Sequence, residues 1–310
     1  MTAKIWFFGT GGFAARCLEE IASKLRPQLV VTAPPSVAGR GLKTRSMPVE
    51  ESALKLELPL RHAAAVNRDE ELIRLYESEK PALILVIDFG QKIGEPWLSG
   101  PRCGCINIHP SLLPRYRGAA PVQRALMNGE TEAGVSLFRL VEKMDAGPVW
   151  LQGRCAVDPE ENAGGLLERM AVAGARLFTE NVASLLDGTA ALTPQDEALA
   201  TVAAKIGKSE ARLDLALGAR KLHDLVRGLC PVPGVYVTFR GRRVKILETR
   251  VARRSDAESG ELFAEDGRLF LGTPQGALEL LTVQPEGKKP MAAGDWGKGL
   301  RLEKGETLDA

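Results

Sequence analysis

The segment INIHPSLLPRYRG, residues 106–118, continues an apolar run and is punctuated by two prolines. Asn107 and His109 are two positions apart, so a strand places both side chains on the same face of a sheet. Pro110 has no amide hydrogen to give to a strand ladder, and we therefore expect the strand to end there. Both polar side chains would then lie at the carboxyl edge of the sheet, where open α/β sheets bind their ligands.

An acid follows in the stretch Met-Asp-Ala-Gly at residues 144–147. The amide of Asn107 can donate hydrogen bonds to an oxyanion, and His109 can donate or move a proton. Asp145 can hold the histidine tautomer and take a proton, directly or through water. Ser111 has no evident base beside it, so the set favours direct acyl transfer between two bound substrates. Spacing alone leaves open that His109 caps a turn and that Asp145 is a surface acid.

The chain before and after this segment alternates between the periods of strands and helices. Strands are predicted over 4–8, 29–32, 83–87, 105–108, 134–140 and 149–157, and helices over 14–25, 49–56, 70–79, 119–127 and 163–186. The run at 83–87 is nearly continuous in branched apolar residues, as expected for a strand buried on both faces. This order predicts a Rossmann-like, doubly wound, mostly parallel sheet.

Composition limits the class of protein. The 310 residues are 45% hydrophobic and 26% charged, which is typical of a globular protein of two domains. Five cysteines without a paired framework suit a reducing compartment, and no second cysteine pair or histidine cluster supports a metal site at Cys103-x-Cys105. No apolar stretch is long enough for a transmembrane helix, and the first strand begins too early for a signal peptide.

A glycine-rich turn follows the first predicted strand. Gly9, Gly11 and Ala14 have the spacing of a dinucleotide-binding fingerprint. That reading also needs an acid at the end of the second strand, where this chain has Ala33 followed by two prolines. We therefore expect a tight turn close to the site rather than an NAD site.

The segments quoted above closely resemble those of the formyltransferases that use 10-formyltetrahydrofolate. The resemblance rests on the Asn-Ile-His and Ser-Leu-Leu-Pro blocks, on residues 115–123, on Gly-Val-Ser at 134–136 and on Met-Asp-Ala-Gly at 144–147. It covers nearly the whole chain and is greatest for the branch that acts on methionyl-tRNA. The resemblance implies that Asn107, His109 and Asp145 are the catalytic residues and that 10-formyltetrahydrofolate is the co-substrate. Nothing in the sequence requires a metal.

The same resemblance implies a folate site on two loops. Its expected residues are Phe89, Gly90, Gln91, Ser111, Leu112, Leu113, Pro114 and Met144. Two positions depart from the family pattern. Asp88 begins the loop that encloses the pterin in the family, and this loop commonly reads Ala-Tyr-Gly there. Gly11 follows Gly9 and Thr10 where the family has the proline of a Gly-Thr-Pro turn.

Two basic segments resemble the family's tRNA contacts. The expected contacts are Arg40, Lys43, Arg45, Lys205 and Lys208. A solvated connection would explain the same charges. Gly207 and Leu215 depart from the family pattern in the second segment, where a hydroxyl residue and a tryptophan are usual.

We expect three consecutive parts: a catalytic domain over 1–188, a linker over 189–206 and a tRNA-binding domain over 207–310. In the last part, a helix over 219–228 precedes short strands whose spacing suits a small β-barrel of the oligonucleotide-binding (OB) type. His223 is expected on the surface of that helix, without a chemical role.

The resemblance therefore implies an enzyme that formylates the amino group of initiator methionyl-tRNA, and we expect it to be monomeric and cytoplasmic. Two alternatives stay open. The same folate site could formylate a nucleotide sugar or another small amine, or the chain could be a tRNA-binding protein with a decayed enzyme domain.

Overall fold

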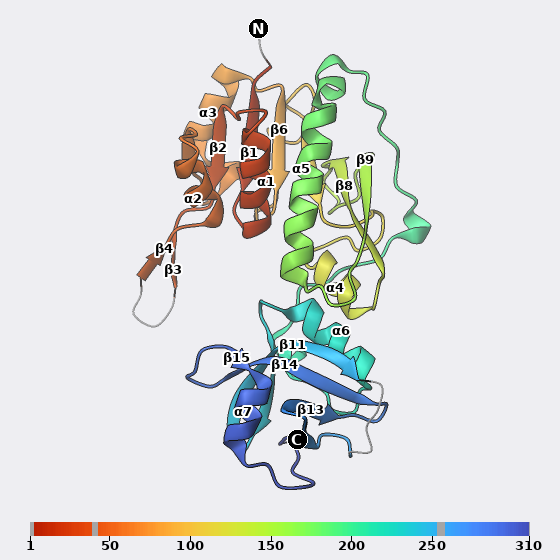
Figure 1. Cartoon of the computed structure of the whole chain (residues 1–310). Coiled ribbons are helices and arrows are strands. Elements are labelled where there is room, and N and C mark those ends of the chain that lie inside the picture. The colour runs from red at the N-terminus through yellow and green to blue at the C-terminus, as the bar shows by residue number, and fades with distance from the viewer. Residues whose placement is uncertain (1–2, 39–42, 253–257, 310) are drawn as a thin grey trace. The chain divides into compact units, whose positions relative to one another are not determined.

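A computed structural model describes residues 3–38, 43–252 and 258–309 of the chain (Figure 1). The chain folds into two compact units that are not continuous in sequence. Unit 1 contains Met1–Gly118, Gly134–Cys155 and Leu167–Val202, and unit 2 contains Ala119–Ala133, Ala156–Leu166 and Ala203–Ala310. The expected domain limits stay a proposal, because compact units need not coincide with units that fold on their own.

Unit 1 is built on a seven-stranded sheet in the order β5-β2-β1-β6-β7-β8-β9. The first five strands of this order are parallel, and β8 is antiparallel to β7. This is the mostly parallel sheet that the sequence predicts. The strands are β1 Ile5–Gly9, β2 Leu29–Thr32, β5 Leu60–His62, β6 Leu83–Ile87, β7 Cys105–His109, β8 Glu132–Arg139 and β9 Val149–Ala156.

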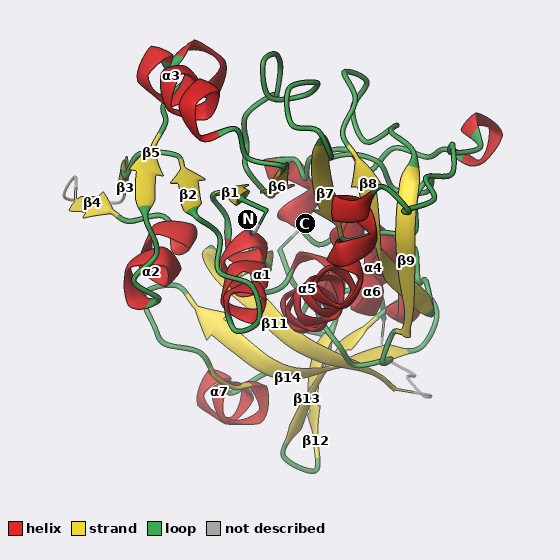
Figure 2. Ribbon diagram, turned by 90° about the horizontal axis from the view of Figure 1, so that it is seen from above, coloured by secondary structure: helices red, strands yellow, loops and turns green. Residues whose placement is uncertain are grey.

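Helices cover both faces of this sheet (Figure 2). On one face, Phe7 and Leu85 pack with residues of α1, α2 and α5, including Leu18. On the other face, Trp6 and Ile84 pack with residues of α3. The period of two in the strands thus supplies one apolar set to each face. The helices and the small hairpin of unit 1 are α1 Gly12–Ala22, α2 Pro48–Lys55, α3 Glu70–Glu79, α5 Ala163–Asp187, β3 Ser36–Ala38 and β4 Lys43–Arg45, with short 3-10 turns at Val66–Arg68 and Glu197–Leu199.

Unit 2 contains an antiparallel sheet whose main path is β10-β11-β14-β13-β12, with β15 paired to β14. The final segment of the chain forms isolated bridges to both ends of this path, from Asp309 to Thr238 and from Thr307 to Glu261. An antiparallel sheet of short strands agrees with the class that the sequence predicts for this part of the chain. Its elements are α4 Pro121–Met127, α6 Ala219–Leu229, β10 Val235–Phe239, β11 Arg242–Ala252, β12 Leu262–Glu265, β13 Arg268–Gly272, β14 Ala277–Pro285, β15 Met291–Ala292, α7 Ala293–Leu300 and a 3-10 turn at Lys208–Ala211.

His223 of α6 is buried, so its expected place on the helix surface is wrong. Its Nε2 lies 2.9 Å from the Pro159 carbonyl oxygen, and its Nδ1 lies 3.0 Å from Oγ1 of Thr249. The carbonyl can only accept, so Nε2 carries the hydrogen and Nδ1 accepts from the hydroxyl. The neighbouring segment at 156–166 covers this side of α6, which the helical period alone could not indicate.

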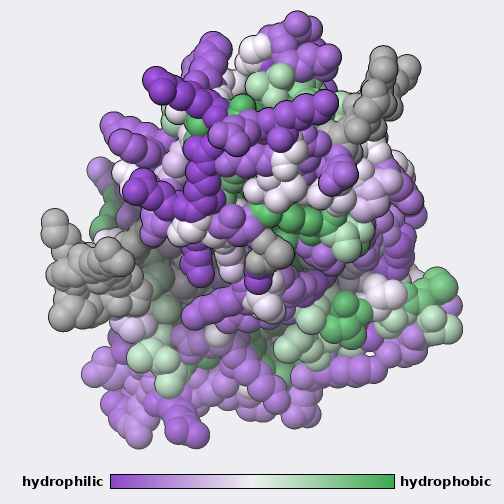
Figure 3. Space-filling model, turned by 90° about the horizontal axis from the view of Figure 1, so that it is seen from below, coloured by the Kyte–Doolittle hydropathy of each residue, from purple (hydrophilic) through white to green (hydrophobic). Residues whose placement is uncertain are grey.

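The surface view in Figure 3 is mostly hydrophilic, with small separate apolar patches. None of the helices in the described parts of the chain is both long and apolar enough to cross a bilayer.

Candidate active site

Strand β7 presents the two predicted polar side chains next to each other at the carboxyl edge of the sheet. It ends at His109, immediately before Pro110. Asn107 pairs with Val86 of β6 and with Phe138 of β8, so it lies between two neighbouring strands. The His109 ring stands edge-on to the Phe138 ring, with 6.3 Å between ring centroids. Because the two residues alternate with buried Ile108, both side chains leave the strand on the same face.

The His109 imidazole is buried and held by the backbone. Its Nε2 lies 3.0 Å from the carbonyl oxygen of Tyr116. A carbonyl accepts but cannot donate, so Nε2 carries a hydrogen in this arrangement. None of the hydrogen bonds found among the described residues involves Nδ1 of His109, which leaves that nitrogen open to accept or release a proton.

Asn107 has an unsatisfied polar atom at this place. Its Oδ1 is buried and has no hydrogen-bond partner in the described parts of the chain. A buried acceptor without a partner is costly and rare in native proteins, and it is most often explained by a bound water or ligand. The side chain therefore has hydrogen-bonding capacity that the described residues do not use.

Asp145 lies in the turn after β8 and is half-buried. Its backbone adopts a positive φ of 49°, which is uncommon for any residue except glycine. Its Oδ2 accepts a hydrogen bond of 2.8 Å from the amide of Gly118. Within the described residues no hydrogen bond joins this carboxylate to His109, so the Tyr116 carbonyl, rather than Asp145, holds the imidazole. The loop from Tyr116 to Gly118 thus touches both residues and links them into one site.

The expected folate loop after β6 is anchored by one side chain. Gln91 accepts a hydrogen bond from the Val66 amide and donates one to the Ala63 carbonyl oxygen, at 2.9 and 2.8 Å. Phe89 is buried against the Phe8 ring, with 5.5 Å between centroids. Gly90 is exposed and has φ of +75°, a conformation that glycine adopts without strain. Gln91 and Phe89 therefore shape the loop, and Gly90 is its most accessible part.

Two residues that were not predicted as site residues, Ser136 and Gln152, hydrogen-bond to the second expected folate loop, residues 111–114. The Ser136 hydroxyl donates to the Ser111 carbonyl oxygen at 2.6 Å and accepts from the Leu113 amide at 3.0 Å. Gln152 donates to the Leu113 carbonyl oxygen at 2.8 Å. Ser136 belongs to the Gly-Val-Ser motif and lies on β8, the strand next to β7. This motif could have identified Ser136 from the sequence. Met144, also expected at the folate, is 73% exposed.

Asp88 stands at the carboxyl end of β6, beside the turn that follows β1. In the sheet, β2 lies on one side of β1 and β6 lies on the other. The strand order therefore reverses between β1 and β6, and such a switch point is where open α/β sheets bind ligands. A Cβ atom on Gly11 would lie 1.8 Å from Oδ2 of Asp88. The two departures from the family pattern therefore belong together, because the Asp88 carboxylate occupies the space that a side chain at position 11 would need.

We expect Asp88→Asn to stabilise the protein above neutral pH. Desolvation by the surrounding protein raises the pKa of Asp88 from 3.8 to about 6, although the residue as a whole is exposed. The folded state therefore binds the proton more tightly than the unfolded state, and the wild type gains stability as the pH falls from about 6 toward about 4. Chemical denaturation across this range should show an advantage of the variant at about pH 8 that disappears at low pH. A difference that is constant with pH would contradict the assignment.

The expected tRNA contacts lie in both units. Lys205 and Lys208 are exposed in unit 2, and Lys208 begins the 3-10 turn Lys208–Ala211. Lys43 and Arg45 lie on β4, whose side chains are outside the described parts, and Arg40 lies outside the described residues altogether.

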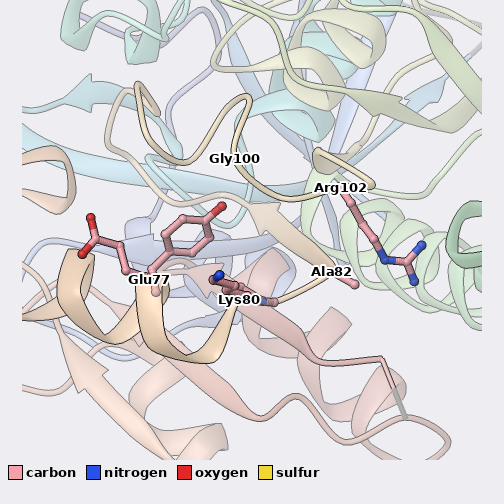
Figure 4. Close-up of a pocket in the computed structure, with 7 residues that line it drawn as sticks. Glu77, Lys80, Ala82, Gly100 and Arg102 are labelled. Atoms are coloured by element: carbon pink, nitrogen blue, oxygen red, sulfur yellow. The ribbon is translucent and has the colours of Figure 1, made fainter. Parts of the chain in front are cut away.

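A surface recess lies at the opposite, amino-terminal end of β6 (Figure 4). Lys80 and Arg102 line it together with Glu77 and Tyr76. Pro81 and Ala82 form part of its wall just before β6 begins, so the recess is separated from His109 by the length of the sheet. It does not contribute to the candidate site. Among the described residues, no three acids, histidines or cysteines come close enough together to hold a metal ion.

Comparison with known proteins agrees with this geometry. The family model "Formyl transferase" matches residues 3–182, and "Formyl transferase, C-terminal domain" matches residues 205–301. The chain is 41% identical to the methionyl-tRNA formyltransferase of Methylobacterium nodulans, over 99% of this chain and 100% of that protein. It is 38% identical to the enzyme of that name from Streptomyces griseus, over 98% and 99% of the two chains.

A solved structure shows the same fold at lower sequence identity. The N-formyltransferase of Helicobacter canadensis, solved with folinic acid and dTDP-3-aminofucose, superposes with a TM-score of 0.68 at 15% identity. The match covers 92% of this chain and 100% of that one.

Proposed function

The chain belongs to the methionyl-tRNA formyltransferase family, and we propose that it moves a formyl group from 10-formyltetrahydrofolate to the amino group of initiator methionyl-tRNA. In this reaction the neutral amine attacks the formyl carbon, a new C–N bond forms, and the bond from that carbon to the folate nitrogen breaks. The amine loses a proton and the folate nitrogen gains one. The enzyme must stabilise the oxyanion of the tetrahedral intermediate and move this proton.

The buried Oδ1 of Asn107 supports this proposal most directly. It has no partner among the described residues, and it lies two residues from an imidazole whose Nδ1 has no hydrogen bond among them either. We assign Oδ1 to accept a hydrogen from the attacking amine. The amide nitrogen of the same side chain then donates to the oxyanion. A preorganised donor of this kind needs no rearrangement during the reaction, which is the basis of oxyanion stabilisation.

His109 and Asp145 complete the proposed set. With Nε2 bonded to Tyr116, the Nδ1 of His109 faces the reaction and, once protonated, donates to the oxyanion. Asp145 uses one carboxylate oxygen to accept from Gly118, and we propose that the other takes the amine proton through a water molecule. Direct support of His109 by Asp145 is not needed in this scheme.

The partners and the setting follow from the same assignment. We propose that the exposed Lys205 and Lys208 contact tRNA phosphates, together with Arg40, Lys43 and Arg45. We also propose a monomer that works in the cytoplasm. The described structure holds five free cysteines, four of them buried, which suits a reducing compartment.

A formylation assay tests the proposed function against its alternatives. Purified protein with 10-formyltetrahydrofolate is offered charged initiator tRNA, free methionine or a nucleotide-linked amino sugar. We expect product only with the charged tRNA. Product from the amino sugar would assign the chain to small-amine formylation, and tRNA binding without any product would make it a binding protein whose enzyme domain is inactive.

A further inference from the structure

We propose that the side chain of Gln195 positions Asp145 for catalysis, which makes the segment after α5 part of the active site. Residues 193–201 follow the last helix of unit 1, in a region whose composition suggests only a linker. The inference rests on the proposed formyl transfer, because it concerns the geometry of that reaction.

The contacts of Gln195 account for both ends of its amide. Its Nε2 donates to the carbonyl oxygens of Asp145 and Gly147, at 2.8 and 2.7 Å. Its Oε1 accepts from Nε and Nη2 of Arg117, at 3.0 and 2.8 Å. Carbonyls only accept and a guanidinium only donates, so the amide can have just one orientation here. The Gln195 side chain therefore binds the backbone of this turn at two points, the carbonyl groups of Asp145 and Gly147.

That turn needs support. Asp145 has a left-handed backbone, and a Cβ atom on Gly147 would lie 1.7 Å from the Arg139 carbonyl oxygen. The turn is therefore both unusual in conformation and tightly packed, and a shift of its backbone would move the carboxylate. Gly118, the residue after Arg117, bonds directly to that carboxylate at 2.8 Å. Arg117 thus connects the Gln195 amide to the residue that holds the side chain of Asp145.

A second carboxylate compensates the charge of Arg117. The Arg117 side chain is buried, and its Nη2 lies 2.9 Å from Glu197. Lys143 lies 2.7 Å from the same carboxylate. Hydrogen bonds from Arg117 and then from Lys143 lower the pKa of Glu197 from 4.5 to about 2. The carboxylate stays charged at all ordinary pH values, so the guanidinium that orients Gln195 keeps its partner.

The same segment also supports His109. Thr201 accepts from the Tyr116 amide through its hydroxyl, at 2.8 Å, and from the Arg117 amide through its carbonyl oxygen, at 2.9 Å. The Tyr116 carbonyl in turn accepts from His109. Residues 193–201 therefore contact the groups that hold two proposed catalytic residues, Asp145 and His109. A segment that only connected two domains would not need these contacts.

The test compares two substitutions of Gln195 with a neighbouring control. Gln195→Ala removes all four hydrogen bonds. Gln195→Glu keeps an acceptor for Arg117 but has no hydrogen to donate to the Asp145 and Gly147 carbonyl oxygens. Asp196→Asn changes the next side chain, which is exposed and caps the short turn at Glu197–Leu199 by accepting from Ala198. We expect this control to behave as the wild type.

The measurements are kcat and KM for both substrates, with the folate affinity and the thermal midpoint of each variant. We expect both Gln195 variants to lose about ten- to a hundred-fold in kcat, the scale on which a small misplacement of a reacting group acts. The KM values and the folate affinity should change little, because Asp145 acts on the transferred proton. A KM effect alone, full activity of Gln195→Glu, or a loss that follows only the thermal midpoint would overturn the inference. A wild type that formylates no amine would instead refute the proposed function.

Discussion

Replacing His109 with alanine is expected to lower the turnover of formyl transfer by about a hundred-fold or more, the usual loss when one oxyanion donor is removed. His109 is the proposed donor whose position is best defined, because its Nε2 is bonded to the Tyr116 carbonyl and its ring packs edge-on against Phe138. Substrate binding does not depend on this donor to the same degree, so kcat should fall more than KM rises. Steady-state kinetics with charged initiator tRNA measures both quantities.

His62→Ala is the matched control. His62 lies on β5, at the far edge of the sheet, and contacts Glu50 at 3.2 Å. Its loss should leave turnover unchanged. Asn107→Ala should resemble His109→Ala, and the double variant should lose much less than the product of the two single losses, because residues that act as one unit are not additive. Unchanged turnover of a well-folded His109→Ala protein would remove His109 from the mechanism.

Replacing Arg227 with alanine is expected to cost about 3–5 kcal/mol of stability, the range found when one partner of a buried ion pair is removed. Arg227 and Asp224 lie one turn apart on α6, with 2.7 Å between them, and each side chain is only 7% exposed. Arg227 also donates to the carbonyl oxygens of Asp158 and Glu161, both at 3.2 Å. Its loss would leave the buried Asp224 carboxylate without its ion-pair partner and would remove the two hydrogen bonds to the backbone. Urea denaturation of the full chain measures the change in unfolding free energy.

The control for this prediction is on the same helix. Arg220→Ala removes an exposed arginine from the first turn of α6, and surface changes of this kind usually stay within about 0.5 kcal/mol. If the two arginine variants lose similar amounts of stability, the buried pair contributes less to the free energy of unfolding than we predict. Removing both partners, in Asp224→Ala with Arg227→Ala, should recover part of the loss, because no uncompensated charge remains.

Local patterns in the sequence were sufficient for most elements of unit 1. The expected helix at Glu70–Glu79 and the strand at Leu83–Ile87 have the observed bounds, and the strand with Asn107 ends immediately before Pro110. The helix after the first strand begins at Gly12, two residues earlier than expected, because Gly11 serves as its N-cap without a side-chain hydrogen bond. Periodicity and proline act within a few residues, so they can be read from one chain.

Long-range contacts decided the rest. Gln195 meets Asp145 across 50 positions and Arg117 across 78, and no local pattern joins residues so far apart. His223 has the spacing of a surface residue, yet a segment some 60 residues earlier covers it. The backbone carbonyl of Tyr116, which contacts the His109 imidazole, could not be read from the sequence either, and the expected role of Asp145 toward His109 stays a prediction.

The amino-acid sequence by itself determined the family and the sheet, and it was enough to propose the amide, imidazole and acid of the site, because these depend on residue types at short, fixed spacings. Only the tertiary structure decided what holds those groups in place. The Tyr116 carbonyl, the Asp88 carboxylate beside Gly11 and the amide of Gln195 take their places only when remote segments pack together.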